Sequence, residues 1–332
     1  MRILITGGCG FIGSNLAIFL KGKIKNVKIA SIDNLSRKGS QLNHKRLSRK
    51  GIKNFKINIV DSSKLIKLPK FDLIIHCAAE PAIEVSRKKI EKVFKSNLVG
   101  TFNVLQKCAK DKSNIIYLSS SRVYAIENLL NLKKKGFVNE DFNIENPKSI
   151  YGFTKVSSEF LIKEYSYLHK IKYIINRVAL VSGPWQFGKQ EQGFVSLWVW
   201  RHLNRLKLSY IGFGGTGRQV RDVLHIEDLC ELVLLQIRKF KKINNKLINV
   251  GGGKKNSLNL IQLTKFCKDI TNNTIRINSV KKTSPYDVPY YISNINYVKK
   301  LYKWKPKRDL KKVITDLYNW MKVNRLVLKK YF

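Results

Sequence analysis

The chain has 332 residues, of which 64 are lysine or arginine and 22 are aspartate or glutamate, so its formal net charge is +42. A hydrophobic content of 44% is enough for a large core, which excludes wholesale disorder. No apolar run approaches the roughly 20 residues that a membrane-spanning helix needs. These observations indicate one large globular domain or two ordinary ones.

The positive charge does not by itself identify a partner. Lysine is spread along the whole chain beside isoleucine and asparagine, which is typical of AT-rich codon use. Basic runs such as "NLKKKG" (131–136) and "KKLYKWKPKR" (299–308) carry no groove-reading motif. We therefore expect no specific nucleic-acid recognition, although a diffuse positive field is compatible with an anionic small substrate.

Cysteine usage and the first residues indicate the compartment. Five cysteines occur without CxxC spacing, which predicts reduced thiols and neither a disulfide framework nor a zinc site. The opening residues, "MRILITGG", enter a strand directly and lack the pattern of a signal peptide. We expect a cytoplasmic protein that holds no metal.

The first half of the chain alternates apolar runs with helical patterns. Near-continuous apolar runs are typical of strands that are buried on both faces of a parallel sheet. Strands are expected at 2–6, 27–32, 55–60, 72–77, 114–119 and 173–178, and helices at 13–21, 88–110 and 151–169. This alternation predicts right-handed β-α-β units and hence a Rossmann-type, doubly wound α/β fold with a parallel sheet.

The rhythm changes after "SGP" (182–184), where the pattern becomes more mixed. The polar stretch 131–149 and the glycine-rich stretch 212–220 are expected to be loops, and Ser257 is the expected N-cap of a helix. We expect a first domain over 1–178 and a smaller α/β substrate-binding lobe over 179–325, interleaved because 221–250 packs back on the sheet. Helices in this half are expected at 193–206, 225–240, 258–270, 294–302 and 309–323, with a strand before "VGGG" (250–253).

The first strand is followed by "TGGCGFIGSNLA" (6–17), in which Gly7, Gly10 and Gly13 form a GxxGxxG pattern. Small residues let the backbone approach a pyrophosphate, which binds the free N–H groups at a helix N-terminus. Asp33 ends the second strand, where a carboxylate accepts both ribose hydroxyls and repels a 2′-phosphate. The pattern predicts NAD as the cofactor, while Arg37 and Lys38 leave NADP open.

Other strand ends meet at the same edge of a parallel sheet. Asp61 and Ser62 follow the third strand, where an adenine amino group needs an acceptor. Ala78 and Ala79, after the fourth strand, leave room for the middle of the cofactor. The remaining residues expected at the cofactor site are Phe11, Ile12, Asn34, Ser36, Arg37, Glu80, Asn97, Ser119, Tyr151, Lys155 and Val178.

The segment "YGFTK" (151–155) carries the expected catalytic groups. Its spacing places Tyr151 and Lys155 on one face of a helix. A lysine cation favours tyrosinate and lowers the pKa of a tyrosine, so Tyr151 can take a hydroxyl proton while hydride leaves to a nicotinamide. A serine at the end of the fifth strand holds the same oxygen; Ser120 is expected in this role, with Ser119 and Ser121 as alternatives.

Together these segments resemble the extended branch of the short-chain dehydrogenase/reductase superfamily. The resemblance covers about residues 1–325 and rests on "TGGCGFIG", "HCAAE", "NLVGTFNVL", "SSSRVY", "YGFTK" and "VRDVLHIEDL". It implies an enzyme that retains NAD through turnover and acts on a nucleotide-diphosphate sugar. It also implies a homodimer or homotetramer formed through the helices near 88–110 and 151–169.

The residues after Ser120 narrow the reaction that the resemblance implies. In the 4,6-dehydratases of this branch, an acidic pair follows the catalytic threonine and drives the elimination of water. Here Ser121 and Arg122 stand in that place, which predicts epimerisation or simple reduction. A non-enzymatic NAD- or RNA-binding protein is the rival of another class, but a pure binding protein has no need of Ser120, Tyr151 and Lys155.

A second segment, "GPWQFGKQEQGFVSLW" (183–198), resembles the CDP-paratose (CDP-tyvelose) 2-epimerases. It favours a CDP-sugar and epimerisation at C2, in polysaccharide biosynthesis. Departures such as Trp185 and Glu191 leave the base and the sugar open, with a UDP-glucose or UDP-N-acetylglucosamine 4-epimerase as the alternative. The substrate-binding residues that it implies are Ser121, Gln186, Phe187, Gln192, Gly193, Arg218, Arg221 and Asp287.

Overall fold

The computed structural model describes residues 1–81, 89–132, 136–189 and 193–332. The chain divides into two compact units, each assembled from segments that are distant in sequence. The first unit comprises Met1–Val123, Ser149–Arg177 and Cys230–Ile248, and the second comprises Tyr124–Lys148, Val178–Leu229 and Asn249–Phe332.

The first unit is built on a seven-stranded sheet in the order β10-β6-β5-β4-β1-β2-β3. Its central strands pair in parallel, with Ile3 opposite both Ile29 and Leu73, as predicted for a Rossmann-type fold. The strands are β1 (Arg2–Thr6), β2 (Lys28–Ile32), β3 (Lys53–Phe55), β4 (Leu73–His76), β5 (Asn114–Ser120), β6 (Tyr173–Val178) and β10 (Lys246–Val250).

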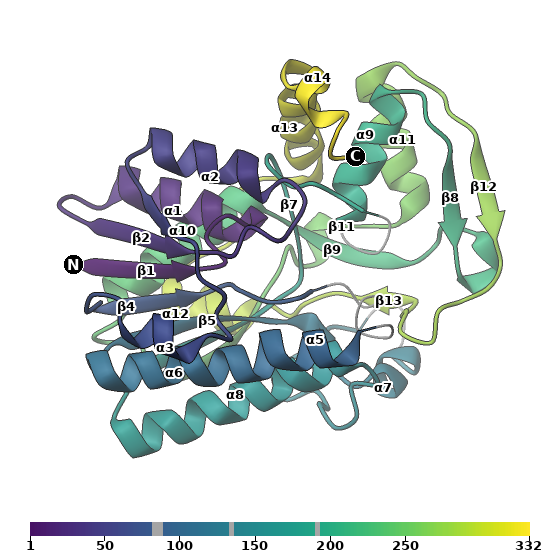
Figure 1. The fold of residues 1–332 in the computed structure, drawn as a ribbon. Coiled ribbons are helices and arrows are strands. Elements are labelled where there is room, and N and C mark those ends of the chain that lie inside the picture. The colour runs from purple at the N-terminus through teal and green to yellow at the C-terminus, as the bar shows by residue number, and fades with distance from the viewer. Residues whose placement is uncertain (82–88, 133–135, 190–192) are drawn as a thin grey trace. The chain divides into compact units, whose positions relative to one another are not determined.

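Helices cover both faces of this sheet. Two of them, α1 (Phe11–Lys23) and α2 (Ser40–Arg49), lie together on one side, while α3, α6 and α8 gather on the other (Figure 1). The second group is α3 (Ser62–Ile66), α5 (Ile90–Phe94), the π-helical turn Lys95–Val99, α6 (Gly100–Asp111) and α8 (Ile150–His169). Apolar side chains of β1, β4 and β5 pack with those of α6 and α8 into one buried cluster.

Three predicted elements differ from the structure for local reasons. The third strand, expected at 55–60, lies at Lys53–Phe55, and directly after it the Ile57 N–H donates to the Phe55 carbonyl at 2.9 Å and turns the chain. The helix expected at 88–110 is interrupted by the π-helical turn Lys95–Val99. Ser257 is not the N-cap of α11 (Leu260–Thr271): it lies in β11 (Ser257–Leu258), and Asn259 caps the helix by a reciprocal pair of hydrogen bonds with Gln262.

The second unit contains short strands and longer helices. Strand β9 pairs with three others, β11, β13 and β7. The strands are β7 (Leu180–Ser182), β8 (Leu208–Ile211), β9 (Val220–His225), β11, β12 (Ile277–Val280) and β13 (Tyr290–Tyr291). The helices are α7 (Ile126–Leu130), α9 (Phe194–Leu203), α11, α12 (Asn296–Tyr302), α13 (Leu310–Val323) and α14 (Arg325–Leu328), and α10 (Ile226–Lys239) begins in this unit and ends in the first.

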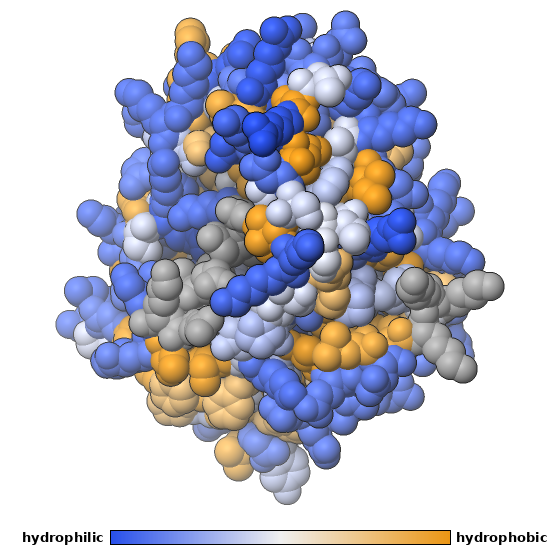
Figure 2. All heavy atoms as spheres, turned by 90° about the vertical axis from the view of Figure 1, so that its right-hand side faces the viewer, coloured by the Kyte–Doolittle hydropathy of each residue, from blue (hydrophilic) through white to orange (hydrophobic). Residues whose placement is uncertain are grey.

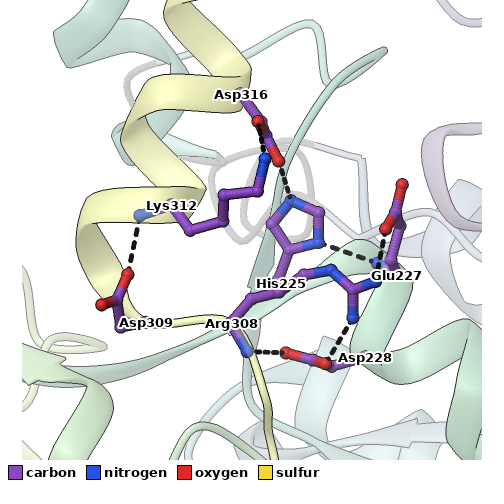
Figure 3. A network of polar contacts seen from close by, with 7 residues as sticks. All are labelled: His225, Glu227, Asp228, Arg308, Asp309, Lys312 and Asp316. Atoms are coloured by element: carbon purple, nitrogen blue, oxygen red, sulfur yellow. Dashed lines mark hydrogen bonds and ion pairs between the residues drawn. The ribbon is translucent and has the colours of Figure 1, made fainter.

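A polar network ties the end of β9 and the start of α10 to the segment that leads into α13 (Figure 3). Asp228 is fully buried, and it accepts hydrogen bonds from the backbone N–H groups of Lys307 and Arg308 and from the Arg308 guanidinium at 2.7 Å. The same guanidinium lies 2.6 Å from the half-exposed carboxylate of Glu227. On the other side of the network, Asp316 lies 3.3 Å from Nε2 of the buried His225.

These two neighbouring carboxylates allow a matched test of burial. We expect Asp228→Ala to lower the free energy of unfolding by about 2–3 kcal/mol, because two backbone N–H groups and a guanidinium lose their buried partner. Glu227→Gln removes the exposed contact to the same arginine and is expected to change it by less than about 0.5 kcal/mol. Urea unfolding of both variants measures the difference, and equal effects would contradict the role given to Asp228.

The surface matches the composition of the chain. On the face drawn in Figure 2, hydrophilic side chains cover most of the surface and apolar ones form smaller groups. Among the described residues, no helix combines the length and the apolar character that crossing a membrane requires.

Candidate active site

The glycine turn after β1 brings backbone segments into very close contact. Gly7 has a φ of +66°, and a Cβ there would lie 2.8 Å from Cα of Ala78 at the end of β4. A Cβ on Gly13 would lie 2.3 Å from the carbonyl oxygen of Gly7. Helix α1 begins after Gly10 with no side-chain cap and no acidic residue in its first turn, so its N–H groups suit a pyrophosphate.

Asp33 lies beside this turn, at the end of β2. Its carboxylate accepts the backbone N–H groups of Cys9 at 3.0 Å and of Leu35 at 2.8 Å. Burial raises the pKa of Asp33, and these hydrogen bonds oppose that rise. Asn34, by contrast, accepts the N–H of exposed Ser36 and shapes the following turn. The uncapped helix, the glycine cradle and the adjacent acid together fit a dinucleotide.

Two glycines of α1 allow a matched test of the close approach. Gly13→Ala is expected to lower the free energy of unfolding by about 1–3 kcal/mol, because the new methyl group meets backbone atoms that cannot move aside. Gly22→Ala, in the same helix with nothing within 4 Å of the new Cβ, should raise it by about 0.5–1 kcal/mol. Thermal unfolding measures the stability of both variants. A Gly13→Ala protein as stable as wild type would contradict the packing constraint at Gly13.

The ends of β3 and β4 carry further predicted cofactor residues. Asp61 caps α3, whose first residue is Ser62, and its carboxylate also pairs with Lys64, which lowers the pKa of Asp61 to about 2. Glu80 lies 3.6 Å from the Arg37 guanidinium and 2.5 Å from the Lys92 ammonium. The structure thus engages both acids in local ion pairs.

Asn97 connects the end of β4 to α8. It lies in the π-helical turn and is 1% exposed. Its amide accepts the Glu80 N–H at 2.7 Å and donates to the Glu80 carbonyl and to the hydroxyl of Thr154, each at 3.2 Å. π-Helical turns are frequent at functional sites because they redirect side chains without ending the helix. Here the turn points Asn97 at α8, next to the expected catalytic residues.

The structure brings Ser120, Tyr151 and Lys155 together within the first unit. Ser120 ends β5, and Ser149 caps α8 by accepting the N–H of Gly152 at 3.0 Å. Tyr151 lies in the first turn of that helix and is 8% exposed. Lys155 is 3% exposed, and its ammonium donates to the Leu118 carbonyl at 2.8 Å.

The sequence predicted that the charge of Lys155 lowers the pKa of Tyr151, and in the structure two arginines act in this direction. Burial raises the pKa of Tyr151, and the hydrogen bond from Ser120 and the charges of Arg122 and Arg37 oppose that rise. Burial lowers the pKa of Lys155 to about 8. Arg122, in the turn after Ser120, therefore adds positive charge beside the tyrosine.

Two predicted substrate residues meet in the second unit. The Arg221 guanidinium, on β9, donates to the Asp287 carboxylate at 2.7 Å and to the Val288 carbonyl at 2.6 Å. Its acidic partner, Asp287, is another of the predicted substrate residues. Asp222 is fully buried, and burial raises its pKa to about 6. Arg218 is exposed.

Two residues of the motif at 183–198, Gln186 and Phe187, contact other protein side chains, whereas the motif predicted contacts with substrate. The Gln186 amide accepts the Ser182 hydroxyl at 2.7 Å and donates to the Val181 carbonyl at 2.9 Å. Phe187 packs edge-on against Trp320 and beside Tyr331. Gly193 precedes α9 with a φ of 77°, and Gln192 lies outside the described residues.

Two buried charges beside the predicted catalytic residues were not expected from the sequence. Glu159, on α8, and Arg177, on β6, are 2% and 3% exposed and form an ion pair at 2.8 Å. Ser119 donates to Glu159 at 2.5 Å. The available signal was the spacing, since Glu159 follows Lys155 by one helical turn as Lys155 follows Tyr151.

Comparison with known proteins agrees with this geometry. The model of the family described as "NAD dependent epimerase/dehydratase family" matches residues 3–251. The chain belongs to this family. It is therefore an NAD-dependent enzyme of the epimerase group, which confirms the predicted class, fold and cofactor.

Individual relatives show how wide the family is. The chain is 30% identical to the CDP-paratose 2-epimerase of Salmonella typhi, over 96% of this chain and 99% of that protein. It is similar to the structure of Thermotoga maritima UDP-glucose 4-epimerase with UDP-glucose, with a TM-score of 0.85, 26% identity and coverage of 98% and 100%. A Bacillus cereus UDP-glucuronic acid 4-epimerase with UDP-glucuronic acid and NAD gives a TM-score of 0.83 and 25% identity, over 97% and 99%.

Proposed function

We propose that the protein epimerises a nucleotide-diphosphate sugar by oxidising one ring hydroxyl and reducing the resulting ketone from the opposite face. The observation that carries the proposal is the set of Ser120, Tyr151 and Lys155 followed by Ser121 and Arg122. This set supplies a proton acceptor for a hydroxyl, but the turn after Ser120 supplies no acid for the elimination of water. NAD supplies the acceptor and donor of hydride.

Each residue has a definite part in the proposed reaction. Tyr151 takes the proton of the sugar hydroxyl as the carbon loses hydride, and it returns that proton when the ketone is reduced. Ser120 donates to the same oxygen and keeps it in line with the tyrosine. The cations of Lys155, Arg122 and Arg37 favour the tyrosinate form. Because the hydride taken from the carbon is returned to it and the proton is returned by Tyr151, the cycle consumes no reductant.

We propose that the remaining predicted residues bind the two ligands. In the first unit, the glycine turn and Asp33 hold NAD, with Asn97 fixing the end of β4 against α8. In the second unit, Arg221 binds the diphosphate, since a guanidinium can donate to two oxygens at once. The ion pair with Asp287 holds it in place until a substrate arrives. Gln186 and Phe187 shape the loop from within.

The favoured substrate is a CDP-sugar, converted at C2 from CDP-paratose to CDP-tyvelose. The segment "QFGKQEQG" and the similarity to the Salmonella typhi enzyme over nearly the whole length of both chains support this choice. The alternative is a UDP-sugar 4-epimerase, which the solved structures favour. A panel of CDP-paratose, UDP-glucose and UDP-glucuronate distinguishes them, and turnover of UDP-glucose alone would reject the C2 assignment.

Replacing the proton acceptor tests the mechanism. Tyr151→Phe keeps the ring but removes the hydroxyl, so turnover is expected to fall by about 10²–10⁴-fold. The protein should still bind NAD, measured by mass spectrometry of the intact sample. Wild-type-like turnover by the variant would exclude Tyr151 as the proton acceptor.

We also propose that the protein is a homodimer through an apolar groove of the first unit. Three phenylalanines at this groove, Phe94, Phe102 and Phe160, are 39–52% exposed. Burying large apolar side chains between two copies removes them from water, which stabilises an interface. The groove is lined by Phe94, Leu98, Val99, Phe102, Ser157, Phe160, Leu161 and Glu164.

Charge placed in the groove should separate the copies. Phe102→Glu combined with Phe160→Glu is expected to convert the dimer to a monomer, because like charges would face each other across the interface. Light scattering after size exclusion measures the mass. Val323→Glu, at an 84% exposed position of the second unit, is the control and should stay dimeric. A monomeric wild type would reject the dimer.

A further inference from the structure

The ion pair of Glu159 and Arg177 has no part in the mechanism described so far, although Glu159 contacts Ser119, the neighbour of Ser120. Both side chains are almost fully buried, at 2% and 3% exposure. The Arg177 guanidinium donates to both carboxylate oxygens, through Nε at 3.1 and 3.2 Å and through Nη2 at 2.8 Å. Burying two charges is costly, so their position beside the catalytic residues requires an explanation.

Glu159 contacts the catalytic segment from two directions. Along α8 it follows Lys155 by one turn, so both side chains point to the same side of the helix. Across to the sheet, it accepts the Ser119 hydroxyl at 2.5 Å, one residue before Ser120. The Lys155 ammonium meanwhile donates to the Leu118 carbonyl. One carboxylate therefore orients the end of β5 and faces the lysine that lies on it.

The charges of the groups around Lys155 show which anion can stabilise its ammonium. Burial lowers the pKa of Lys155 to about 8, which a Cys77 thiolate or the Glu159 carboxylate would oppose. Desolvation, however, raises the pKa of Cys77 to about 12 and lowers that of His76 to about 3, so both are uncharged at neutral pH. The ring of Tyr117 lies 4.6 Å from the Lys155 nitrogen and is also neutral, because burial raises its pKa. Glu159 and its partner Arg177 are the charged groups that remain in this set.

We infer that Glu159 is a positioning residue of the reaction: it holds Lys155 in its protonated form and fixes the Ser119–Ser120 end of β5. Arg177 holds the carboxylate in place between the two elements. The inference rests on the proposed function for the need of a lysine cation beside Tyr151. It adds that a buried acid, Glu159, controls the protonation of Lys155 without itself binding the substrate.

The test separates this electrostatic role from simple pairing with Arg177. Glu159→Gln alone leaves a buried guanidinium without its partner and risks unfolding. The double variant Glu159→Gln/Arg177→Gln removes both charges and leaves two neutral amide side chains, each able to donate and to accept hydrogen bonds. Glu145→Gln, at an exposed position of the second unit, is the control for loss of one carboxylate.

The pH dependence of kcat is the first measurement. Wild type and the Glu145→Gln control should lose activity at high pH as Lys155 loses its proton. In the double variant, this loss is expected about one pH unit lower, because the ammonium has lost its anionic neighbour. If the carboxylate only neutralises Arg177, removing both charges restores the wild-type profile, and that result overturns the inference.

A second measurement needs no substrate. Because the folded-state pKa of Lys155 lies below its unfolded value, the unfolded chain binds the extra proton between about pH 8 and 10.5. Folding stability from this residue therefore rises with pH across that window. The rise should begin at lower pH in the double variant and be absent in Lys155→Met, measured by urea unfolding. If the rise begins at the same pH in the double variant and the wild type, the inference about Glu159 is overturned. If no nucleotide sugar is turned over, only the proposed function is rejected.

Discussion

Helical periodicity on α8 is the constraint on which the first unit depends. Tyr151, Lys155 and Glu159 follow one another at intervals of one turn, so a proton acceptor, a cation and an anion lie in a row along one side of the helix. The ends of β5 and β6 meet this row with Ser120, the Leu118 carbonyl and Arg177. Moving the helix by one residue would break every one of these contacts together.

A second constraint is the scarcity of acid. With 22 carboxylates against 64 basic residues, a surface role for each acid would still leave the surface strongly positive. Several of them are instead buried at junctions: Glu159 between α8 and the sheet, Asp228 at the start of α10, and Asp222 beside the glycines that follow β10. These buried acidic side chains join secondary-structure elements.

The sequence predicted what depends on local patterns and missed what depends on distant pairing. Strands 2–6 and 173–178 and the glycine turn coincide with the structure because apolar runs and positive φ are local properties. The short strands of the second unit, such as β11 and β13, gave no pattern, since two residues carry no periodicity and their partners lie elsewhere along the chain. Gln186 was expected to face substrate because its motif said nothing of the Ser182 hydroxyl that it binds. Glu159 was overlooked because a glutamate in a helix ordinarily faces water.

The arginines of this lysine-rich chain differ from its lysines in the contacts that they make. Where lysine is so abundant, a site that needs only positive charge can be filled by lysine at no structural cost. Arg177, Arg221 and Arg308 each bind at least two acceptor oxygens through several N–H groups, which a single ammonium cannot reproduce. In a lysine-rich chain, arginine therefore marks the places where geometry, rather than charge, decides the residue.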